Sequence, residues 1–362
     1  MDLLARLTVL GSLNMDISVT VPTLPSPGAT VLGGAASFAP GGKGANQAVA
    51  AARLGCAANI KVRMVGCVGD DDFGRTLKAT LAKEGVNDQA VRTVPGAPTG
   101  IAMITVDEAG ENIITVAPGA NHEVGAPEIA VISESAGAAA GAGSANVLVI
   151  SAEVPVPAIL AALAAAGAVP RDAPAPDPGI THDSAGPGDA GGPRGPRWLT
   201  VLNLAPAPPG AEAAGILGAR PDWLVVNESE AAAVLARPVS GLAEAAGAAA
   251  DLVAAGARNA VVTAGAAGAA YHGAAADGES QELRGTVAAF PVRAVDTVGA
   301  GDTFVGALAV ALAAGISPAE AVTAAAAAGA AAAARPGTQA GMPRPADIRT
   351  ATGYEWPLTV RE

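Results

Sequence analysis

The pattern of hydrophobic and polar positions predicts a chain that alternates between buried strands and helices. Short runs of Val, Leu and Ile bounded by Gly, Pro or Asn are typical of buried strands, whereas longer Ala-rich runs with helical periodicity are typical of helices. Strands are expected at Leu7–Leu10, Val62–Val68, Val147–Ile150, Leu199–Asn203, Trp223–Val226 and Ala260–Thr263. Helices are expected at Ala158–Ala166, Leu242–Ala255, Thr303–Ala314 and Ala319–Ala334, and also after Gly42 and up to about Lys83. The alternation predicts an α/β fold, with a mostly parallel central sheet covered by helices on both faces.

Two further groups of strand-like residues do not fit this alternation. Ile17–Val21 and Thr30–Phe38 are separated by a Pro-rich turn, and Thr99–Val106 and Asn112–Val116 are joined by a short acidic turn that is typical of a hairpin. We expect them to form a small separate sheet. This sheet would be a lid, made by about residues 16–40 and 99–116, over one edge of the main domain.

One segment differs from the rest of the chain in composition. Residues 169–197 are rich in Pro, Gly and Asp and have almost no large apolar side chain. Such a segment buries too little surface to offset the entropy lost on ordering, so a mobile surface insertion is expected. The remaining pattern predicts a single domain at residues 1–345, followed by a C-terminal tail at 346–362.

Composition and charge narrow the possible functions. Hydrophobic residues make up 51% of the chain and aromatic residues only 2%, which predicts a core of Val, Leu, Ile and Ala in closely packed helices. The formal net charge is -12 and no basic run is present, so neither a nucleic acid nor an anionic membrane is expected as a partner. Cys56 and Cys67 are interpreted as buried thiols and Asp70–Asp72 as a solvated acidic loop. No signal peptide or transmembrane helix is predicted, and the expected location is cytoplasmic.

The turn Gly299-Ala300-Gly301-Asp302 has the composition of an anion site. Small residues let the backbone approach a ligand closely, and the helix that follows offers unpaired N–H groups and the positive end of its dipole. An Asp in this turn would face a bound phosphoryl group, where it can accept the proton of an attacking hydroxyl. A plain helix N-cap is the alternative role for this Asp.

Two other polar groups occur where a helix is expected to begin. The string from Gly41 to Asn46 carries Lys43 and Asn46, which can bond a polyol, although it fits neither a Walker A loop nor a dinucleotide fingerprint. A structural helix start is the alternative there. Asn227 and Glu230 follow a buried strand, where ligands bind in open α/β sheets, and their oxygens suit Mg²⁺ directly or through water. The alternative for this pair is a helix cap with a solvated carboxylate.

Seven sequence blocks appear in an order that points to one enzyme family. They are GSLNMD at 11–16, GGKGANQAVAAARLG, GDDDFG, AGENIITVAPGAN, LNLAPAP, VNESEAA and AVDTVGAGDTFVGAL. In these blocks, from about residue 7 to residue 343, the chain resembles the ribokinase branch of the PfkB-type carbohydrate kinases. The resemblance implies the ribokinase-like fold, a three-layer α/β domain with a small β-sheet lid. It also implies phosphorylation of D-ribose at O5 by ATP, which gives D-ribose 5-phosphate and ADP.

The resemblance further implies a role for individual residues. Asp302 would be the general base, and the N–H groups of Ala300, Gly301 and Asp302, next to Gly299, would form the anion hole. The sugar would be bound by Asn14, Asp16, Gly42, Lys43, Asn46, Glu153 and Asp302. The nucleotide phosphates and Mg²⁺ would be held by Asn203, Asn227, Glu230, Thr263, Gly265 and Gly301. A monovalent cation, K⁺, would be held by the loops that contain Asp296, Val298, Ala332, Arg335, Gly337 and Gly341. A homodimer through the lid is expected, because exposed strand edges offer a pairing surface.

Two alternatives to a ribose kinase remain open. One is a kinase of another small sugar or a nucleoside, because this fold serves many acceptors. Asn14 and Asp16 together with Lys43 and Asn46 favour a free pentose, and a phosphosugar is disfavoured because residues 16–40 and 99–116 contain no Arg or Lys. The other alternative is a non-catalytic module that senses a sugar or a nucleotide. The intact turn at Asp302 argues against it, because a non-catalytic protein has no need of this carboxylate.

Overall fold

A large, mostly parallel sheet forms the centre of the molecule. The computed structural model describes residues 6–135, 146–167, 198–273 and 283–358, so the insertion expected at 169–197 lies outside the described residues. Within these ranges the sheet has nine strands in the order β13-β12-β11-β10-β9-β8-β1-β4-β5. The parallel strands are β1 (Arg6–Leu10), β4 (Lys61–Gly69), β5 (Asn87–Val94), β8 (Val147–Ser151), β9 (Leu199–Asn203), β10 (Trp223–Asn227) and β11 (Asn259–Thr263). Two antiparallel strands, β12 (Gly268–Gly273) and β13 (Leu283–Ala288), complete one edge.

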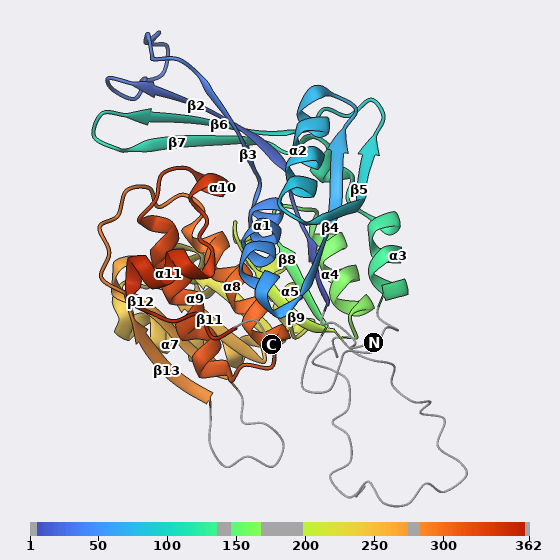
Figure 1. Ribbon diagram of the computed structural model, residues 1–362, viewed down its shortest axis with the longest axis vertical. Coiled ribbons are helices and arrows are strands. Elements are labelled where there is room, and N and C mark those ends of the chain that lie inside the picture. Colours follow the sequence, from blue (N-terminus) through green and yellow to red (C-terminus); the bar gives the residue numbers. More distant parts are fainter. Residues whose placement is uncertain (1–5, 136–145, 168–197, 274–282, 359–362) are drawn as a thin grey trace, which may run out of the picture.

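Helices cover both faces of this sheet, which gives the predicted three layers (Figure 1). One core cluster packs the sheet against α1 (Lys43–Gly55), α2 (Asp72–Lys83), α8 (Ala300–Ala313), α9 (Pro318–Ala333) and α11 (Pro345–Thr352). The other packs the opposite face against α3 (Ala126–Ser135), α4 (Val156–Ala165), α5 (Gly210–Gly218), α6 (Glu228–Leu235) and α7 (Gly241–Ala255). Among the described helices, none is both long and apolar enough to cross a membrane. The predicted fold class is confirmed.

A second, four-stranded sheet forms the lid, in the order β3-β2-β6-β7. It contains β2 (Asn14–Val21), β3 (Ser37–Gly41), β6 (Gly100–Asp107) and β7 (Asn112–Ala117), and it projects over the side of the main domain that carries the short helix α10 (Thr338–Gly341) (Figure 1). The strand expected at Thr30–Phe38 is wrong, because the chain becomes a strand only at Ser37. Leu32 in that stretch is 89% exposed, so its apolar residues have no core to pack against.

Helices α1 and α8 lie in unusually close contact because small residues line both of them. A Cβ atom added to Gly306 of α8 would lie only 2.8 Å from the carbonyl oxygen of Gln47 in α1, and 2.9 Å from Cβ of Ala50. Ala48 and Ala51 of α1 are fully buried beside this contact. The prediction of a core of Val, Leu, Ile and Ala in closely packed helices is confirmed. This contact also brings the beginnings of α1 and α8 together.

Two local expectations were wrong. The segment expected to be a C-terminal tail packs against the domain instead, with Ile348 of α11 fully buried. Trp356 is also buried, and its Nε1 donates to the carbonyl oxygen of Leu54 at 3.1 Å. Of the two cysteines expected to be buried, Cys67 is buried but Cys56 is exposed, because it lies just beyond the last turn of α1.

Candidate active site

The polar residues expected to bind ligands gather at the carboxyl ends of the central strands. Glu153 follows β8, Asn203 ends β9, Asn227 ends β10 and Thr263 ends β11. Asn14, which opens the lid strand β2, comes directly after the turn that follows β1. These strands are neighbours and run parallel, so the five side chains line one edge of the sheet. In open α/β sheets this edge is where ligands bind.

The beginning of α1 is fixed against the end of β1 by a glycine and a carboxylate. Gly42 is the N-cap of α1 with φ 87°, and a Cβ there would lie 2.6 Å from the backbone nitrogen of Asn14, so both the conformation and the space require glycine. Glu153 Oε2 accepts hydrogen bonds from Ser12 Oγ at 2.6 Å and from the backbone N–H of Lys43 at 3.2 Å. The alternative of a structural helix start is therefore correct for Gly42, and the same turn also brings Lys43 into the site.

Asn14 is buried and positioned by a residue that sequence reasoning missed. Its Oδ1 accepts from Asn121 Nδ2 at 2.8 Å. Asn121 in turn binds both backbone groups of Leu13, accepting from its N–H at 2.9 Å and donating to its carbonyl oxygen at 3.1 Å. Asn121 belongs to the APGAN string at the end of one of the seven blocks, and that membership was the only signal for it.

Asp16 and Lys43 lie within a group of carboxylates whose charges influence one another. A Cβ on Gly41 would collide with the Asp16 carboxylate, so β3 passes directly beneath it. Burial, followed by the negative charges of Glu153 and Asp302, raises the pKa of Asp16 to about 7, although Lys43 opposes the rise. Burial acts to lower the pKa of Lys43, but the surrounding carboxylates, Asp302 foremost, raise it overall. Lys43 therefore stays protonated at neutral pH, whereas Asp16 can exist in either form.

Asp302 lies in the first turn of α8 and both of its carboxylate oxygens accept hydrogen bonds. Oδ2 accepts from Asn46 Nδ2 at 2.9 Å and Oδ1 from Gln47 Nε2 at 3.1 Å. The residue is only 8% exposed. The N-cap of α8 is Gly299, with φ 80°, and Asp302 stands three residues later without capping the helix. The alternative of a plain N-cap is therefore wrong for Asp302.

The first turn of α8 offers backbone donors for an anion. The N–H of Ala300 donates to the carbonyl oxygen of Thr297 at 3.2 Å, so this group is already engaged in a turn. The N–H groups of Gly301 and Asp302 have no acceptor in their own helix, because the first N–H groups of a helix never do. A Cβ on Gly301 would meet nothing within 4 Å, so the space in front of this turn is open.

Two glutamines missed from the sequence extend the network around Asp302. Gln47 Nε2 also donates to Asn203 Oδ1 at 2.9 Å, which joins α8, α1 and the end of β9. Gln339 of α10 donates from Nε2 to Asn46 Oδ1 at 3.0 Å. Gln47 follows Asn46 in its block, and Gln339 lies between Gly337 and Gly341, but nothing in the local sequence indicated what either side chain contacts.

On the side expected to bind the nucleotide, Asn227 and Glu230 form a capping box at the start of α6. Asn227 Oδ1 accepts from the N–H of Glu230, and Glu230 Oε2 accepts from the N–H of Asn227, both at 2.8 Å. The helix-cap interpretation is thus correct for their geometry. Burial raises the pKa of Glu230, the positive charge of Lys43 lowers it and the negative charge of Asp302 raises it. The Glu230 carboxylate is therefore close enough to interact electrostatically with both. Thr263 Oγ1 donates to the carbonyl oxygen of Val226 at 3.4 Å, and Gly265 has φ 51° and open space around it.

The loops expected to hold a monovalent cation are joined by one carboxylate. Asp296 accepts from the N–H of Val298 at 3.0 Å and from the N–H of Gly337 at 2.9 Å. A Cβ on Gly341 would lie 3.2 Å from the carbonyl oxygens of both Arg335 and Pro336. The N–H of Arg335 donates to the carbonyl oxygen of Ala332 at 3.0 Å. The guanidinium of Arg335 forms an ion pair with Asp347 at 2.6 Å. The predicted loops therefore do come together, and their backbone oxygens face the small residue Gly341.

Comparison with known proteins places this site in a family. The pfkB family carbohydrate kinases match the chain over residues 4–169 and 200–345, which is most of its length. The chain belongs to the pfkB family of carbohydrate kinases. The resemblance seen in the seven sequence blocks is thereby confirmed.

Individual members of this family resemble the chain to different extents. A ribokinase of Schizosaccharomyces pombe is 48% identical over 121 residues, which cover 33% of this chain and 38% of the relative, so the match spans well under half the length of that curated protein. The crystal structure of a ribokinase from Thermotoga maritima is 28% identical with a TM-score of 0.73, and covers 96% of this chain and 98% of its own. The structure of Arabidopsis thaliana ribokinase complexed with ribose and ATP is 25% identical with a TM-score of 0.73, and covers 97% of this chain and all of its own.

The acidic loop at Asp70–Asp72 of this family member is more than a solvated turn. Asp71 caps α2 by accepting from the N–H of Gly74 at 2.8 Å, and it accepts from the N–H and Oγ1 of Thr99 at 2.8 and 2.6 Å. These bonds lower the pKa of Asp71 against the effect of burial. Thr99 immediately precedes β6, so Asp71 fixes the point where this lid strand leaves the main domain. The interpretation as a solvated loop holds for Asp70 and Asp72, which are exposed, and is wrong for Asp71.

Proposed function

We propose that this pfkB family protein phosphorylates D-ribose at O5 with ATP, giving D-ribose 5-phosphate and ADP. The observation that carries the proposal is the position of Asp302. Its buried carboxylate stands beside the open first turn of α8, accepts a hydrogen bond from Asn46 and lies close enough to Asp16 and Lys43 to influence their charges. Ribokinases among the relatives, one of them solved with ribose and ATP, support ribose as the acceptor.

In this mechanism Asp302 acts as the general base. The amide groups of Asn46 and Gln47 each donate one hydrogen bond to its carboxylate, which fixes its orientation and leaves lone pairs on both oxygens for a hydroxyl proton. The primary hydroxyl of the sugar gives its proton to Asp302 as its oxygen attacks the γ-phosphorus of ATP, and the bond to the leaving ADP oxygen breaks. The N–H groups of Gly301 and Asp302 stabilise the negative charge on the transferred group.

The sugar hydroxyls would be held by residues that differ in what they can donate and accept. Asn14 and Asn46 offer amide groups, Lys43 offers a cation, and Asp16 and Glu153 offer carboxylates. A free pentose presents several neighbouring hydroxyls, each both a donor and an acceptor, and so matches this mixed set. A sugar that already carries a phosphate would instead meet four carboxylates around a single lysine, which makes it a poor ligand.

The residues present fit both metal ions that the family implies. Across the described parts of the chain, no cluster of three or more His, Cys, Asp or Glu side chains could hold a metal, so Mg²⁺ would be bound by Glu230 and Asn227 through water and by the nucleotide phosphates. There it would neutralise phosphate charge. K⁺ would be bound by backbone oxygens such as those of Arg335 and Pro336, which converge beside Gly341. Its charge would add to the positive potential of the anion hole.

A homodimer through the lid is part of the proposal. Several large apolar side chains on β6 and β7 are about half exposed, at 43–51%: Met103, Ile113, Ile114 and Val116. Both faces of the hairpin carry them, because Ile113 and Ile114 are adjacent and point to opposite sides. One face would cover the sugar and the other would pack against a second lid. Ile113→Lys, on the face opposite to Asp16 in the strand register, should convert a dimer into a monomer in light scattering, whereas a wild-type protein that is already monomeric contradicts this part of the proposal.

The test is ADP release from MgATP with a panel of acceptors, D-ribose first, for the wild type and for Asp302→Asn. We expect ribose-dependent turnover that falls by about 10²–10⁴-fold in Asp302→Asn, the range attributed to a general base. Asp72→Asn is the matched control, since it makes the same change at a side chain that is 96% exposed, and should keep full activity. Turnover only with another sugar or a nucleoside would overturn ribose but keep Asp302 as base. Binding of ATP with no turnover on any acceptor would instead favour a sensing module.

A further inference from the structure

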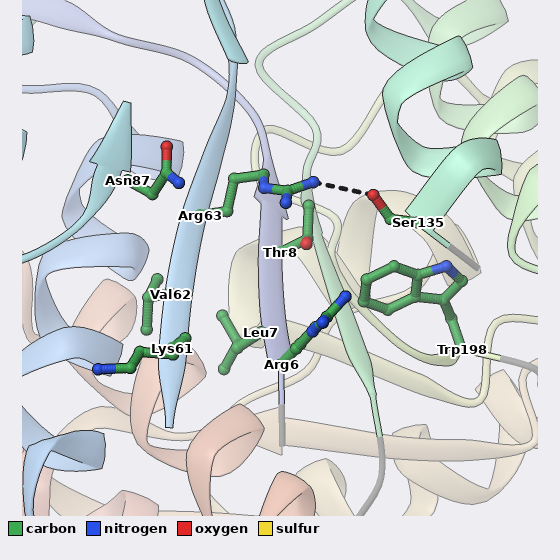
Figure 2. A pocket seen from close by; sticks show the side chains of 9 residues that line it. All are labelled: Arg6, Leu7, Thr8, Lys61, Val62, Arg63, Asn87, Ser135 and Trp198. Atoms are coloured by element: carbon green, nitrogen blue, oxygen red, sulfur yellow. Dashed lines mark hydrogen bonds between the residues drawn. The ribbon is translucent and has the colours of Figure 1, made fainter. Parts of the chain in front are cut away.

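A pocket of about 250 Å³ lies at the opposite end of the central strands from the active site. It is lined by the first residues of β1 and β4, together with Ser135 at the end of α3 and Trp198 just before β9 (Figure 2). The active site occupies the carboxyl ends of these parallel strands, so the sheet separates the two. Nothing in the proposed kinase reaction uses this pocket.

The pocket is positively charged in a chain with a net charge of -12. Arg6 of β1 pairs in register with Lys61 of β4, and Thr8 pairs with Arg63. Side chains two apart on a strand share a face, so all four lie on the same side of the sheet. No acidic residue lines the pocket. Within the described ranges Arg6 and Lys61 form no ion pair, and Arg63 is bonded only to Ser135 Oγ, from Nη1 at 2.8 Å.

A hydroxyl without a hydrogen-bond partner among the described residues points into the same space. Thr8 is only 3% exposed, and its side chain makes no hydrogen bond to any residue that the structure describes. Figure 2 shows this hydroxyl between the side chains of Arg63 and Arg6, with the ring of Trp198 on the far side of the pocket. A ligand oxygen in the pocket would accept a hydrogen bond from this hydroxyl while its negative charge neutralises the cations.

We propose that this pocket binds a phosphate group, either as free phosphate or as the monoester of a small metabolite. A phosphate carries nearly two negative charges and several acceptor oxygens, which suits three cations and a hydroxyl better than a single carboxylate does. The guanidinium of Arg63, held by Ser135, can present a pair of parallel donors to it. The volume is below the 300–1,000 Å³ of drug-sized sites, which favours a small phosphate compound over a whole nucleotide. The proposal does not depend on which sugar the active site accepts.

The test combines calorimetry with the fluorescence of Trp198. Inorganic phosphate is titrated at low ionic strength, where exposed charges are least screened, into the full-length wild type and into Arg63→Gln and Lys61→Gln. Each loss of a charged donor should weaken phosphate binding by about tenfold or more. Arg349→Gln makes the same charge change at a side chain 62% exposed on α11 and should bind phosphate like the wild type. Thermal unfolding of each variant checks that it is folded.

Phosphate binding at the active site must be distinguished from binding here. The chain has three tryptophans, and only Trp198 lines this pocket, so Trp198→Phe should lose the fluorescence change while calorimetry still detects binding. Asp302→Asn should leave the Trp198 signal unchanged. Ribose 5-phosphate that binds more tightly than phosphate, with the same dependence on Arg63, would identify a monoester as the ligand; equal or weaker binding would identify free phosphate. No binding, or binding that Arg63→Gln and Lys61→Gln leave unchanged, would overturn the proposal.

Discussion

The ionisation of Asp16 should control how tightly the sugar binds near neutral pH. Burial and the charges of Glu153 and Asp302 raise its pKa to about 7. An ionised carboxylate accepts hydrogen bonds at both oxygens, whereas the protonated form must use one oxygen as a donor. If Asp16 accepts from two sugar hydroxyls, the sugar binds the ionised form. Its affinity should therefore increase as the pH rises through 7.

The size of the effect follows from the pKa. With a pKa of about 7, roughly one tenth of Asp16 is ionised at pH 6 and about nine tenths at pH 8. The dissociation constant for the sugar should therefore fall about tenfold across this interval. In Asp16→Asn the pH dependence should disappear, and the sugar should bind more weakly than to the wild type at pH 8, because an amide offers only one acceptor oxygen.

The raised pKa of Asp16 should also make the stability of the folded protein depend on pH, in the direction opposite to that of sugar binding. The pKa of Asp16 is higher in the folded, sugar-free protein than its ordinary value of 3.8, so between about pH 4 and pH 7 the folded state binds more protons than the unfolded state. Stability should therefore decline as the pH rises through this window. Asp16→Asn removes the buried charge and should raise the free energy of unfolding at pH 8 by roughly 2–4 kcal/mol.

The assay is titration calorimetry of ribose without ATP at pH 6, 7 and 8, with urea unfolding of the same samples. Asp70→Asn, on an exposed loop, is the control and should behave like the wild type in both measurements. A wild-type dissociation constant that stays constant from pH 6 to pH 8 would refute the reasoning. So would an Asp16→Asn variant that keeps the pH dependence, since another group would then be responsible.

Three further predictions rest on separate contacts. Gln47→Leu removes the donors to Asp302 Oδ1 and Asn203 Oδ1, so kcat should fall by about tenfold or more with a smaller change in the KM for sugar, in steady-state assays. Gly306→Ala places a methyl 2.8 Å from a backbone oxygen of α1 and should destabilise the protein by about 1–3 kcal/mol in urea unfolding, whereas Gly215→Ala, in open space on α5, should stabilise it by up to about 1 kcal/mol. Asp296→Ala frees the two loops it joins, and the turnover difference between K⁺ and Na⁺ should vanish; an unchanged difference would place the cation elsewhere.

The parts of the fold that were predictable are those with a strong local signal. Strands such as β1 and β8 are continuous apolar runs bounded by turn residues, and the structure places them as expected. β5 was missed because its sequence, NDQAVRTV, contains few apolar residues and lies at the edge of the sheet. Strand β12, which lies between β11 and β13, was missed because it is made largely of Gly and Ala, which have little preference for strands.

The types of residue in the candidate site were predictable, but the hydrogen bonds between them were not. The motifs pointed to Asp302, Lys43 and Asn46, because these stand in glycine-containing turns at the beginnings of helices. The amide of Gln339 on Asn46, and that of Asn121 on Asn14, depend on contacts between segments far apart in the chain. Neither hydrophobic periodicity nor capping rules contain information about such contacts. Asp71 was misinterpreted for the same reason, since its partner Thr99 is 28 residues away.

The packing of α1 against α8 also determines when the protein can become active during its synthesis. Asp302 and its hydrogen-bond donor Asn46 are separated by 256 residues of sequence. A ribosome therefore completes most of the chain before Asp302, the proposed base, and its hydrogen-bond donors can meet, and no shorter nascent fragment holds a complete set of these groups. If Asp302 is the base, turnover requires that α8 has docked against α1. Two fragments, one ending before α8 and one beginning with it, should each lack activity, because neither holds both Asp302 and its hydrogen-bond donors.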